Sequence, residues 1–346
     1  MLSLFLLPPI TPYHSPLLPI IMNNQKQKGN HSPLSWRGGG GEAADKLYMR
    51  RCIQLALNGR QNARPNPMVG AVIVHEGRII GEGYHVRCGE GHAEVNAFAS
   101  VKPEDECKLP ESTIYVSLEP CAHYGKTPPC ADLIIRKGVR RVVVGCVDPF
   151  AKVRGKGISK IREAGIEVTV GVLEKECERL NSRFMTFHEH HRPYIILKWA
   201  QTINGFIDDN GQALAISTPF TKMLGHKLRA ENDAILVGRV TDEREHPALT
   251  VRHWSGPNPR RFVLSHNNTI ESILAECHAT GLQSLIVEGG LKTHEAFLSA
   301  GLWDEIRVET APITVTGGTP APTLPADARI ISRETYDGNT ITTFKK

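Results

Sequence analysis

The residues with the clearest chemistry lie between His92 and Cys130. Glu94 stands two positions after His92, and eight residues separate Cys121 from Cys130. One imidazole and two thiolates can bind zinc as three ligands, and a catalytic zinc site keeps its fourth position for water. A carboxylate beside that water can move protons without binding the metal. The pattern predicts a catalytic zinc site with His92, Cys121 and Cys130 as ligands and Glu94 as the acid–base group.

The surrounding sequence predicts the elements that position these side chains. Residues 92–99 are typical of a helix whose first turn holds the imidazole and the carboxylate. Residues 113–117 are typical of a strand that ends shortly before the first thiolate. A second helix is predicted to start near Cys130, and helix N-termini favour anions such as thiolates. His-x-Glu followed by Pro-Cys and a later Cys is the arrangement of zinc-dependent nucleobase deaminases, although two residues usually separate those cysteines.

The eight-residue insert between the cysteines leaves two alternatives to consider. His123 lies within it and would close the site as a fourth ligand, which is the arrangement of a structural zinc module rather than an enzyme. Glu94 argues against this, because a structural site has no use for a carboxylate there. A deaminase acting on nucleic acids or nucleosides is the other alternative, and the insert and the lack of a basic groove argue against it.

Three segments together resemble one enzyme family. Residues 65–70 (Pro-Asn-Pro-Met-Val-Gly), 91–94 (Gly-His-Ala-Glu) and 117–130 (Ser-Leu-Glu-Pro-Cys-Ala-His-Tyr-Gly-Lys-Thr-Pro-Pro-Cys) are similar to the bifunctional deaminase/reductase family of riboflavin biosynthesis. In that family the eight-residue insert is usual, so the departure from the general deaminase pattern supports the resemblance. The similarity covers about residues 43–346.

The resemblance implies an α/β protein of two domains. Residues 43–191 would form a cytidine-deaminase-like domain of three α/β/α layers, and residues 192–346 an abbreviated dihydrofolate-reductase-like α/β domain. The first would use Zn²⁺ to deaminate a phosphorylated diaminopyrimidine ribosylamine by hydrolysis. The second would use NADPH to reduce the ribosyl group to ribityl. Family members commonly associate through the reductase half, so a homodimer is also expected.

Composition and charge fit this class of protein. The chain has 346 residues, 40% apolar and 22% charged, which is ordinary for a globular protein and long enough for two domains. The net charge of +5 is mild and no Lys/Arg-rich run occurs, so neither nucleic acid nor a membrane is expected as a partner. The eight cysteines do not form a disulfide framework, which favours a reducing cytoplasm.

Residues 1–42 differ from the rest of the chain. The first 21 residues are apolar but contain five prolines, and a stretch of four glycines ends near residue 41. That density of proline does not suit a membrane helix, and neither a positive start nor a clear cleavage site marks a signal peptide. We therefore expect a disordered extension, with a targeting role as the alternative. The family has no such extension, so a start of translation at Met22 or later is an alternative.

Strands and helices are predicted to alternate through the first domain, which favours a three-layer α/β fold. Helices are expected at 45–57, 155–165 and 174–191, and strands at 69–74, 78–83, 140–146 and 166–170. The last helix ends in His188-Glu189-His190-His191, which we interpret as a basic helix end favoured by the dipole rather than a metal site. Asn66, in an extended Pro-Asn-Pro loop, is predicted to bind the pyrimidine edge. An Asx turn is the alternative, and His85 is either a substrate contact or a plain loop residue.

The second domain is predicted to contain strands at 194–200, 234–238, 261–264 and 284–288 and helices at 219–231, 269–280 and 293–300. A glycine turn after the 284–288 strand can cradle phosphate at the start of the last helix. By resemblance, the residues near substrate are Lys198, Arg229, Leu249, Arg252 and Glu288. The residues matched to the NADPH site are Ala200, Thr241, Glu245, Gly290, Leu291, Lys292, Thr293, His294, Glu295 and Ala296.

The second domain departs from the family in several places. Asn204 and Glu245 stand where Asp is usual or frequent, and Ala213 and Ala215 stand where relatives carry Ser and Trp. The largest departure follows residue 264, where a four-residue turn leads directly into a helix although the family usually has some tens of further residues. The reductase fold is therefore predicted to be abbreviated. A deaminase that carries a degenerate reductase domain is the alternative function.

Overall fold

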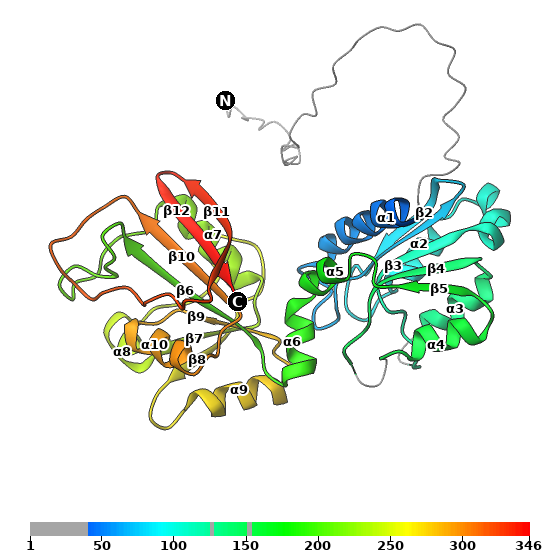
Figure 1. Ribbon diagram of the computed structural model, residues 1–346. Helices are drawn as coiled ribbons and strands as arrows, with labels where there is room; N and C mark the ends of the chain where they lie inside the picture. Colours follow the sequence, from blue (N-terminus) through cyan, green and yellow to red (C-terminus); the bar gives the residue numbers. More distant parts are fainter. Residues whose placement is uncertain (1–40, 125–127, 151–153) are drawn as a thin grey trace, which may run out of the picture. The chain divides into compact units, whose positions relative to one another are not determined.

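The computed structural model describes residues 41–124, 128–150 and 154–346 (Figure 1). The extension predicted for residues 1–42 lies almost entirely outside these ranges. Within them the chain forms two separate sheets, one in each half of the sequence. No helix in the described part is both long and apolar enough to cross a membrane.

The first sheet has the strand order β2-β1-β3-β4-β5. Its strands are β1 (Gly70–His75), β2 (Arg78–Tyr84), β3 (Thr113–Leu118), β4 (Arg141–Cys146) and β5 (Glu167–Val170). β1 pairs with β2 and β3 in antiparallel fashion, whereas β3, β4 and β5 are parallel. The flanking helical elements are α1 (Gly41–Ala56), η1 (Leu57–Gly59), α2 (Ala93–Ala99), η2 (Pro103–Glu111), α3 (Cys130–Lys137), α4 (Lys156–Glu163), α5 (Glu174–Leu180) and α6 (Ser182–His190).

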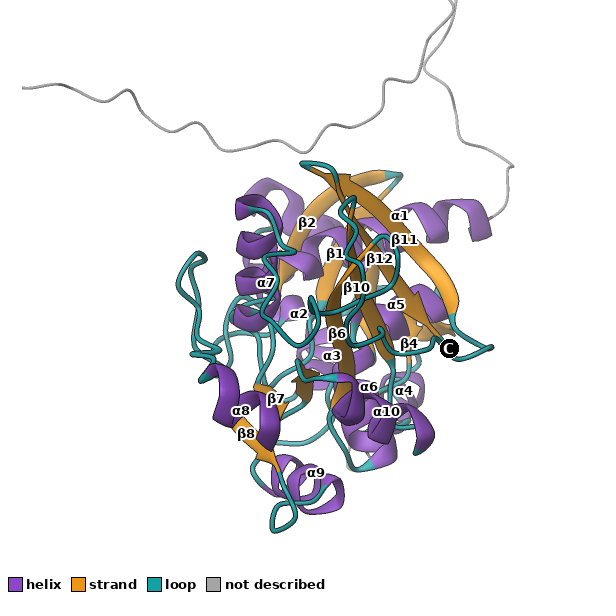
Figure 2. Cartoon of the chain, turned by 90° about the vertical axis from the view of Figure 1, so that its left-hand side faces the viewer, coloured by secondary structure: helices purple, strands orange, loops and turns teal. Residues whose placement is uncertain are grey.

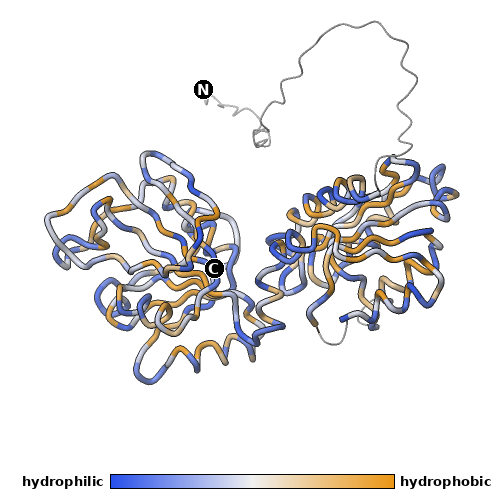
Figure 3. Tube along the Cα trace, viewed as in Figure 1, coloured by the Kyte–Doolittle hydropathy of each residue, from blue (hydrophilic) through white to orange (hydrophobic). Residues whose placement is uncertain are grey.

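Alternation along β1 explains the three layers. Ile73 packs into one core with buried residues of α2, α3 and α4, whereas Val72 and Val74 pack into another with buried residues of α1 and α5. Successive side chains of a strand point to opposite faces, so an apolar run buries both faces of the sheet under helices. Figure 3 shows the hydrophobic residues gathered in the strands of both sheets. The predicted α/β/α arrangement is confirmed.

The prediction of one helix over 174–191 was wrong. α5 and α6 are separate because Asn181, between them, leaves helical geometry. Its buried side-chain amide accepts a hydrogen bond from the Met68 N–H at 2.8 Å and donates one to the Met68 carbonyl at 2.9 Å. A pair of bonds to a distant loop is a tertiary effect that helical periodicity does not reveal.

His188 and His190 lie in the last turn of α6, as predicted, but His188 is also a packing residue. Its ring packs against Phe184, with centroids 4.4 Å apart, and against Phe187 and Phe150. Burial lowers the pKa of His188, and the nearby His278 and His191 lower it further. Its packing and its lowered pKa both favour the neutral ring.

The second sheet, within the described residues, has the order β11-β12-β10-β6-β9-β7-β8. Figure 2 draws strands in orange and helices in purple. β6 pairs in parallel with β9 and β10, and β7 with β8 and β9, while β12 is antiparallel to β10 and β11. The strands are β6 (Tyr194–Thr202), β7 (Ala234–Gly238), β8 (Arg260–Leu264), β9 (Ser284–Val287), β10 (Glu305–Ala311), β11 (Arg329–Tyr336) and β12 (Asn339–Lys345). The helices are α7 (Pro219–Ala230), α8 (Arg239–Glu245), α9 (Ile270–Ala279) and α10 (Leu291–Ser299).

Helices cover both faces of this sheet as well. Ile195 and Leu197 of β6 pack in a core that includes buried residues of α9 and α10, whereas Ile196 packs in a core with Leu228 of α7. The direct passage from β8 to α9 that the sequence predicted is confirmed. Thr269 caps α9 by accepting a hydrogen bond from the Ser272 N–H. α8 and the last three strands were not predicted, and α10 starts two residues earlier than expected.

Candidate active sites

The three predicted zinc ligands come together at the ends of three elements. His92 is the N-cap of α2, Cys121 follows β3, and Cys130 is the first residue of α3. The Nδ1 atom of His92 lies 3.6 Å from the Cys121 Sγ and 3.4 Å from the Cys130 Sγ. Their ligand atoms all lie within 4.8 Å of one another, which fits a zinc ion, whereas His123 is exposed and outside this group.

The start of α3 favours a thiolate at Cys121. The backbone N–H of Cys130 donates to the Cys121 Sγ at 3.3 Å. A hydrogen bond from the Cys130 thiol, together with His92, lowers the pKa of Cys121 to about 4, while the same thiol pair raises the pKa of Cys130. The helix N-terminus therefore stabilises a sulfur anion, as expected, but its N–H points to the thiolate that lies outside the helix.

Glu94 is placed to exchange protons beside these ligands. It lies in the first turn of α2 and is 3% exposed. Burial, and after it the charge of Cys121, raise the pKa of its carboxyl to about 7. A carboxyl with a pKa near neutrality suits both halves of a proton transfer, because it can accept a proton and return it.

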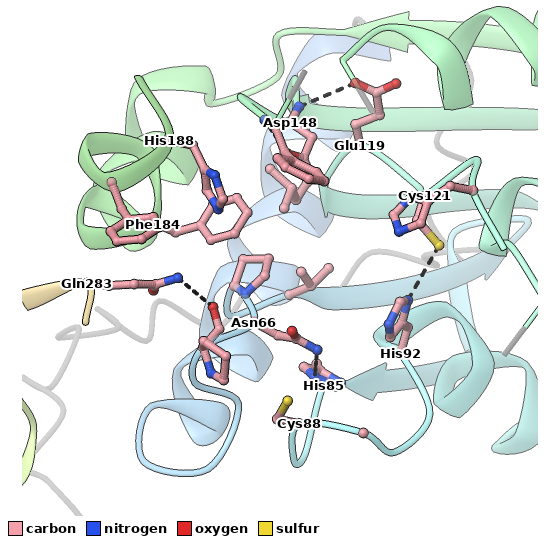
Figure 4. A pocket seen from close by; sticks show the side chains of 18 of the residues that line it. Asn66, His85, Cys88, His92, Glu119, Cys121, Asp148, Phe184, His188 and Gln283 are labelled. Atoms are coloured by element: carbon pink, nitrogen blue, oxygen red, sulfur yellow. Dashed lines mark hydrogen bonds between the residues drawn. The ribbon is translucent and has the colours of Figure 1, made fainter. Parts of the chain in front are cut away.

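A cavity of about 510 Å³ opens next to this group (Figure 4). Asn66 lines one wall, and its Nδ2 lies 3.1 Å from the Nε2 of His85. The Nδ1 of His85 lies 3.2 Å from the Gly91 carbonyl, so the network favours a neutral ring with its proton on Nδ1. Burial also lowers the pKa of His85. The Asn66 side chain thus contacts a pocket residue instead of closing the local Asx turn that was the alternative.

Sequence reasoning missed the opposite wall of the cavity. Asp148 and Phe150 follow β4, and Phe184, Phe187 and His188 come from α6. Burial raises the pKa of Asp148 to about 6. The spacing of the aromatic residues of α6 is visible in the sequence as an apolar stripe. That pattern is also typical of ordinary core packing, so it does not indicate a pocket.

Glu119 is a second residue whose role the sequence did not reveal. Its buried carboxylate accepts hydrogen bonds from the backbone N–H groups of Asp148, Gly155, Gly157 and Ile158, at 2.9–3.3 Å. These bonds tie the segment after β4 and the start of α4 to the residue just before Pro120-Cys121. A carboxylate that binds four backbone donors fixes the wall that carries Asp148.

In the second domain, the predicted substrate residues also meet. Arg229 of α7 forms a two-bond ion pair with Glu288 after β9, at 2.6 and 3.1 Å. Burial raises the pKa of Glu288, but Lys198 of β6 and Arg229 outweigh it, and the net pKa is lowered. Arg229 therefore already has a carboxylate partner within the chain.

The loop after α8 brings the remaining substrate candidates to the same place. Arg229 also donates to the Thr250 carbonyl at 3.4 Å, and Leu249 is buried with a positive φ of 50°. The N–H of Arg252 donates to the Nδ1 of His226 at 3.0 Å, while the Arg252 side chain is exposed. His226, which holds this loop, was not predicted.

Part of the predicted NADPH site fits a dinucleotide phosphate. Within the described residues, no side chain caps the N-terminus of α8 or of α10, and each has glycine as its N-cap. A Cβ at Gly290 would lie 3.6 Å from the Thr241 Oγ1, and one at Gly289 would lie 2.8 Å from Thr293. Two helix N-termini beside closely packed glycines leave backbone N–H groups for an anion, which suits the cofactor's phosphates.

The other predicted cofactor residues lie in different environments. Ala200 is half-buried on β6, and Gly290 and Leu291 are half-buried at the start of α10. Glu245 is exposed at the end of α8, and Lys292, Glu295 and Ala296 are exposed on α10. His294 is fully buried, and neither ring nitrogen has a hydrogen-bond partner in the described structure.

The substitutions noted in the sequence have simple structural outcomes. Asn204 accepts a hydrogen bond from the Thr202 hydroxyl and donates one to the Val315 carbonyl, each at 2.8 Å, so it stabilises the turn after β6. Ala213 and Ala215 are both exposed.

Comparison with known proteins supports both halves of this description. Residues 42–146 match the family described as the cytidine and deoxycytidylate deaminase zinc-binding region, and residues 193–272 and 267–336 match the RibD C-terminal domain. The riboflavin biosynthesis protein RibD of Aquifex aeolicus is 38% identical over 313 residues, covering 78% of this chain and 87% of that protein. The chain belongs to the RibD family.

Other RibD proteins are similar along most of their length. RibD of Bacillus amyloliquefaciens is 35% identical over 336 residues, covering 81% of this chain and 87% of that protein. The crystal structure of a diaminohydroxyphosphoribosylaminopyrimidine deaminase/5-amino-6-(5-phosphoribosylamino)uracil reductase from Thermotoga maritima has a TM-score of 0.78 and 31% identity. That comparison covers 88% of this chain and 99% of the other.

Membership of the RibD family makes this chain a bifunctional enzyme of riboflavin biosynthesis, with a zinc-dependent deaminase domain and an NADPH-dependent reductase domain. The two segments that match the reductase family overlap at residues 267–272, which is where β8 passes directly into α9. The alignment to the reductase family is therefore interrupted at the place where the sequence analysis predicted missing residues.

Proposed function

We propose that residues 43–191 hydrolyse the exocyclic amine of a diaminohydroxyphosphoribosylaminopyrimidine and that residues 192–346 reduce the 5-amino-6-(5-phosphoribosylamino)uracil that results. The observation that carries the first half is the buried Glu94 beside three clustered ligands. The Thermotoga maritima relative, which is described as both the deaminase and the reductase, supports the substrate assignment.

In the deaminase, His92, Cys121 and Cys130 would hold the zinc, which when bound supplies a Lewis acid that makes water nucleophilic near neutral pH. Glu94 accepts one proton from the attacking water and gives it to the pyrimidine ring nitrogen, and it then carries the remaining hydroxyl proton to the departing amine. The amine on the ring is thereby replaced by a carbonyl, and ammonia leaves. Asn66 orients the pyrimidine edge by hydrogen bonds from its amide.

In the reductase, Lys198, Arg229, Leu249, Arg252 and Glu288 would surround the ribosyl phosphate. The Arg229 guanidinium is already paired with Glu288, so the exposed Arg252 is the better placed of the two arginines to contact a phosphate. NADPH, when bound, supplies the hydride. Ala200, Thr241, Glu245 and residues 290–296 would line its site, with the phosphates at the N-termini of α8 and α10.

The test supplies each substrate separately to purified, zinc-loaded protein. With the diamino substrate we expect ammonia release, and with the deaminated uracil substrate we expect loss of NADPH absorbance that depends on substrate. If neither signal appears with protein that is folded and carries zinc, the proposed substrates are wrong. Ammonia release without NADPH loss would establish the second candidate function, a deaminase with a degenerate reductase domain. The shortened passage from β8 to α9 is the observation that favours that candidate.

We also propose a homodimer formed through the reductase domain, in the cytoplasm. β11 is an edge strand of its sheet, and Ile330 and Ile331 on it are each 54% exposed, so its unpaired edge offers apolar surface and backbone groups to a second copy. All eight cysteines lie in the described residues and none forms a disulfide, which suits a reducing compartment. Light scattering of the wild-type protein and of I330K should show a dimer and a monomer respectively, and a monomeric wild-type protein would exclude the interface.

A further inference from the structure

A residue of the reductase half forms part of the deaminase cavity. Gln283 lies just before β9 and is 7% exposed, and together with Gly281 it lines the cavity beside the zinc ligands. Its Nε2 donates to the carbonyl of Pro65 at 2.8 Å (Figure 4). Pro65 immediately precedes Asn66, the residue assigned to the pyrimidine edge.

A second contact holds the same short segment. The guanidinium of Arg64 donates to the Asp233 carboxylate and to the Ala230 carbonyl, each at 3.0 Å. Asp233 also accepts from the Gln283 N–H and the Ser284 hydroxyl, each at 3.0 Å. The residues that hold Arg64 and Pro65 are thus linked to one another through a single carboxylate at the start of β7.

The segment has few other constraints on its own. Asn66 donates its N–H to the Ala63 carbonyl, and Met68 is held by Asn181 on the far side of the loop. The Asn66 amide must keep its 3.1 Å contact with His85 while it faces the cavity. Residues 63–66 form a turn rather than the extended loop expected from the sequence, and neither Pro65 nor Pro67 has a backbone N–H to donate, so the position of the segment depends on hydrogen bonds from its neighbours.

We propose that Gln283 is a positioning residue for the deaminase reaction, which acts by fixing Pro65 and hence the orientation of Asn66. The reductase half then has a second role, because it completes the deaminase pocket whether or not it is reducing its own substrate. This inference rests on the proposed role of Asn66 in binding the pyrimidine.

The variant Q283M tests the hydrogen bond, because Met has a similar length but no donor. In the full-length, zinc-loaded protein we expect a rise of about fivefold in KM for the diamino substrate, with kcat little changed, since one net hydrogen bond is lost. Zinc content and NADPH oxidation with the uracil substrate should stay at wild-type values. The control is R60Q, which removes a nearby ion pair between Arg60 and Glu231, 4.0 Å apart, without reaching Pro65; its KM should not change.

A double-mutant cycle with N66A tests positioning by Gln283 separately from the proposed role of Asn66 in binding the pyrimidine. If Gln283 acts through Asn66, the double variant N66A/Q283M should be no worse than N66A alone. If N66A deaminates normally, the assigned role of Asn66 is wrong and the inference falls with it. If N66A is impaired but Q283M is not, the role of Asn66 stands and positioning by Gln283 is refuted. Equal loss of both activities in Q283M, with a lower unfolding temperature, would mean a structural role only.

Discussion

The two active sites of this chain are built in different ways. In the deaminase, the proposed zinc ligands and Glu94 lie within 39 positions of one another, at the ends of α2, β3 and α3. In the reductase, the candidates come from β6, α7, the loop after α8 and the end of β9, and two of them are paired with each other. Compact spacing made the first site recognisable, whereas single charged residues far apart in the sequence gave no comparable pattern.

Metal removal should separate the two sites most strongly. Treating the protein with a chelator should abolish ammonia release, because the three ligands have no other means of activating water. NADPH oxidation with the deaminated substrate should continue at the wild-type rate. Restoring zinc should restore ammonia release, and loss of both activities with retained secondary structure would show that the sites are not independent.

Substitution of Glu94 by Gln should give the next largest effect. The amide keeps the shape of the side chain but cannot accept a proton, so kcat for deamination should fall by about a hundredfold to ten-thousandfold. Zinc content and NADPH oxidation should be unchanged, which measurement of bound metal and of absorbance would check. Normal deamination by E94Q would refute the catalytic assignment of Glu94. It would also remove the argument against a structural zinc site.

A smaller effect is expected from the exposed arginine of the reductase. R252Q removes a guanidinium that the substrate phosphate can reach, so KM for the uracil substrate should rise by about tenfold, roughly the loss of one charge-assisted hydrogen bond. The unfolding temperature should change little, since the Arg252 side chain is exposed and its own bond to the Thr250 hydroxyl, at 3.2 Å, lies at the surface, while the backbone N–H that bonds His226 is kept. A variant with unaltered KM would place the phosphate elsewhere.

The sequence predicted local features of the fold well and contacts between distant residues poorly. The strand over 113–117 and the helix that starts at Cys130 were predicted correctly, and the first helix starts one residue later than expected, with His92 as its N-cap rather than in its first turn. These are all local features. The break at Asn181 and the anchoring of four backbone groups by Glu119 depend on partners distant in the sequence, and neither has a periodic signal. Gln283 meets Pro65 across more than two hundred positions, which hydrophobic spacing cannot reveal.

The smallest effect should appear in the pH dependence of stability, and it concerns the charge pair that sets the second site apart. The pKa of Glu288 is lower in the folded chain than its usual unfolded value near 4.3, because Lys198 and Arg229 favour its carboxylate. Its contribution to the free energy of unfolding is therefore fully present above that unfolded pKa and is lost as pH falls through the folded pKa. E288Q cannot titrate, so the stability advantage of the wild-type protein over E288Q, measured by urea unfolding, should shrink from pH 6 to about pH 3. If the difference in unfolding free energy between wild type and E288Q stayed constant across that range, the pair of Glu288 with Arg229 would not depend on ionisation. Arg229 would then not differ from Arg252 by having a charged partner.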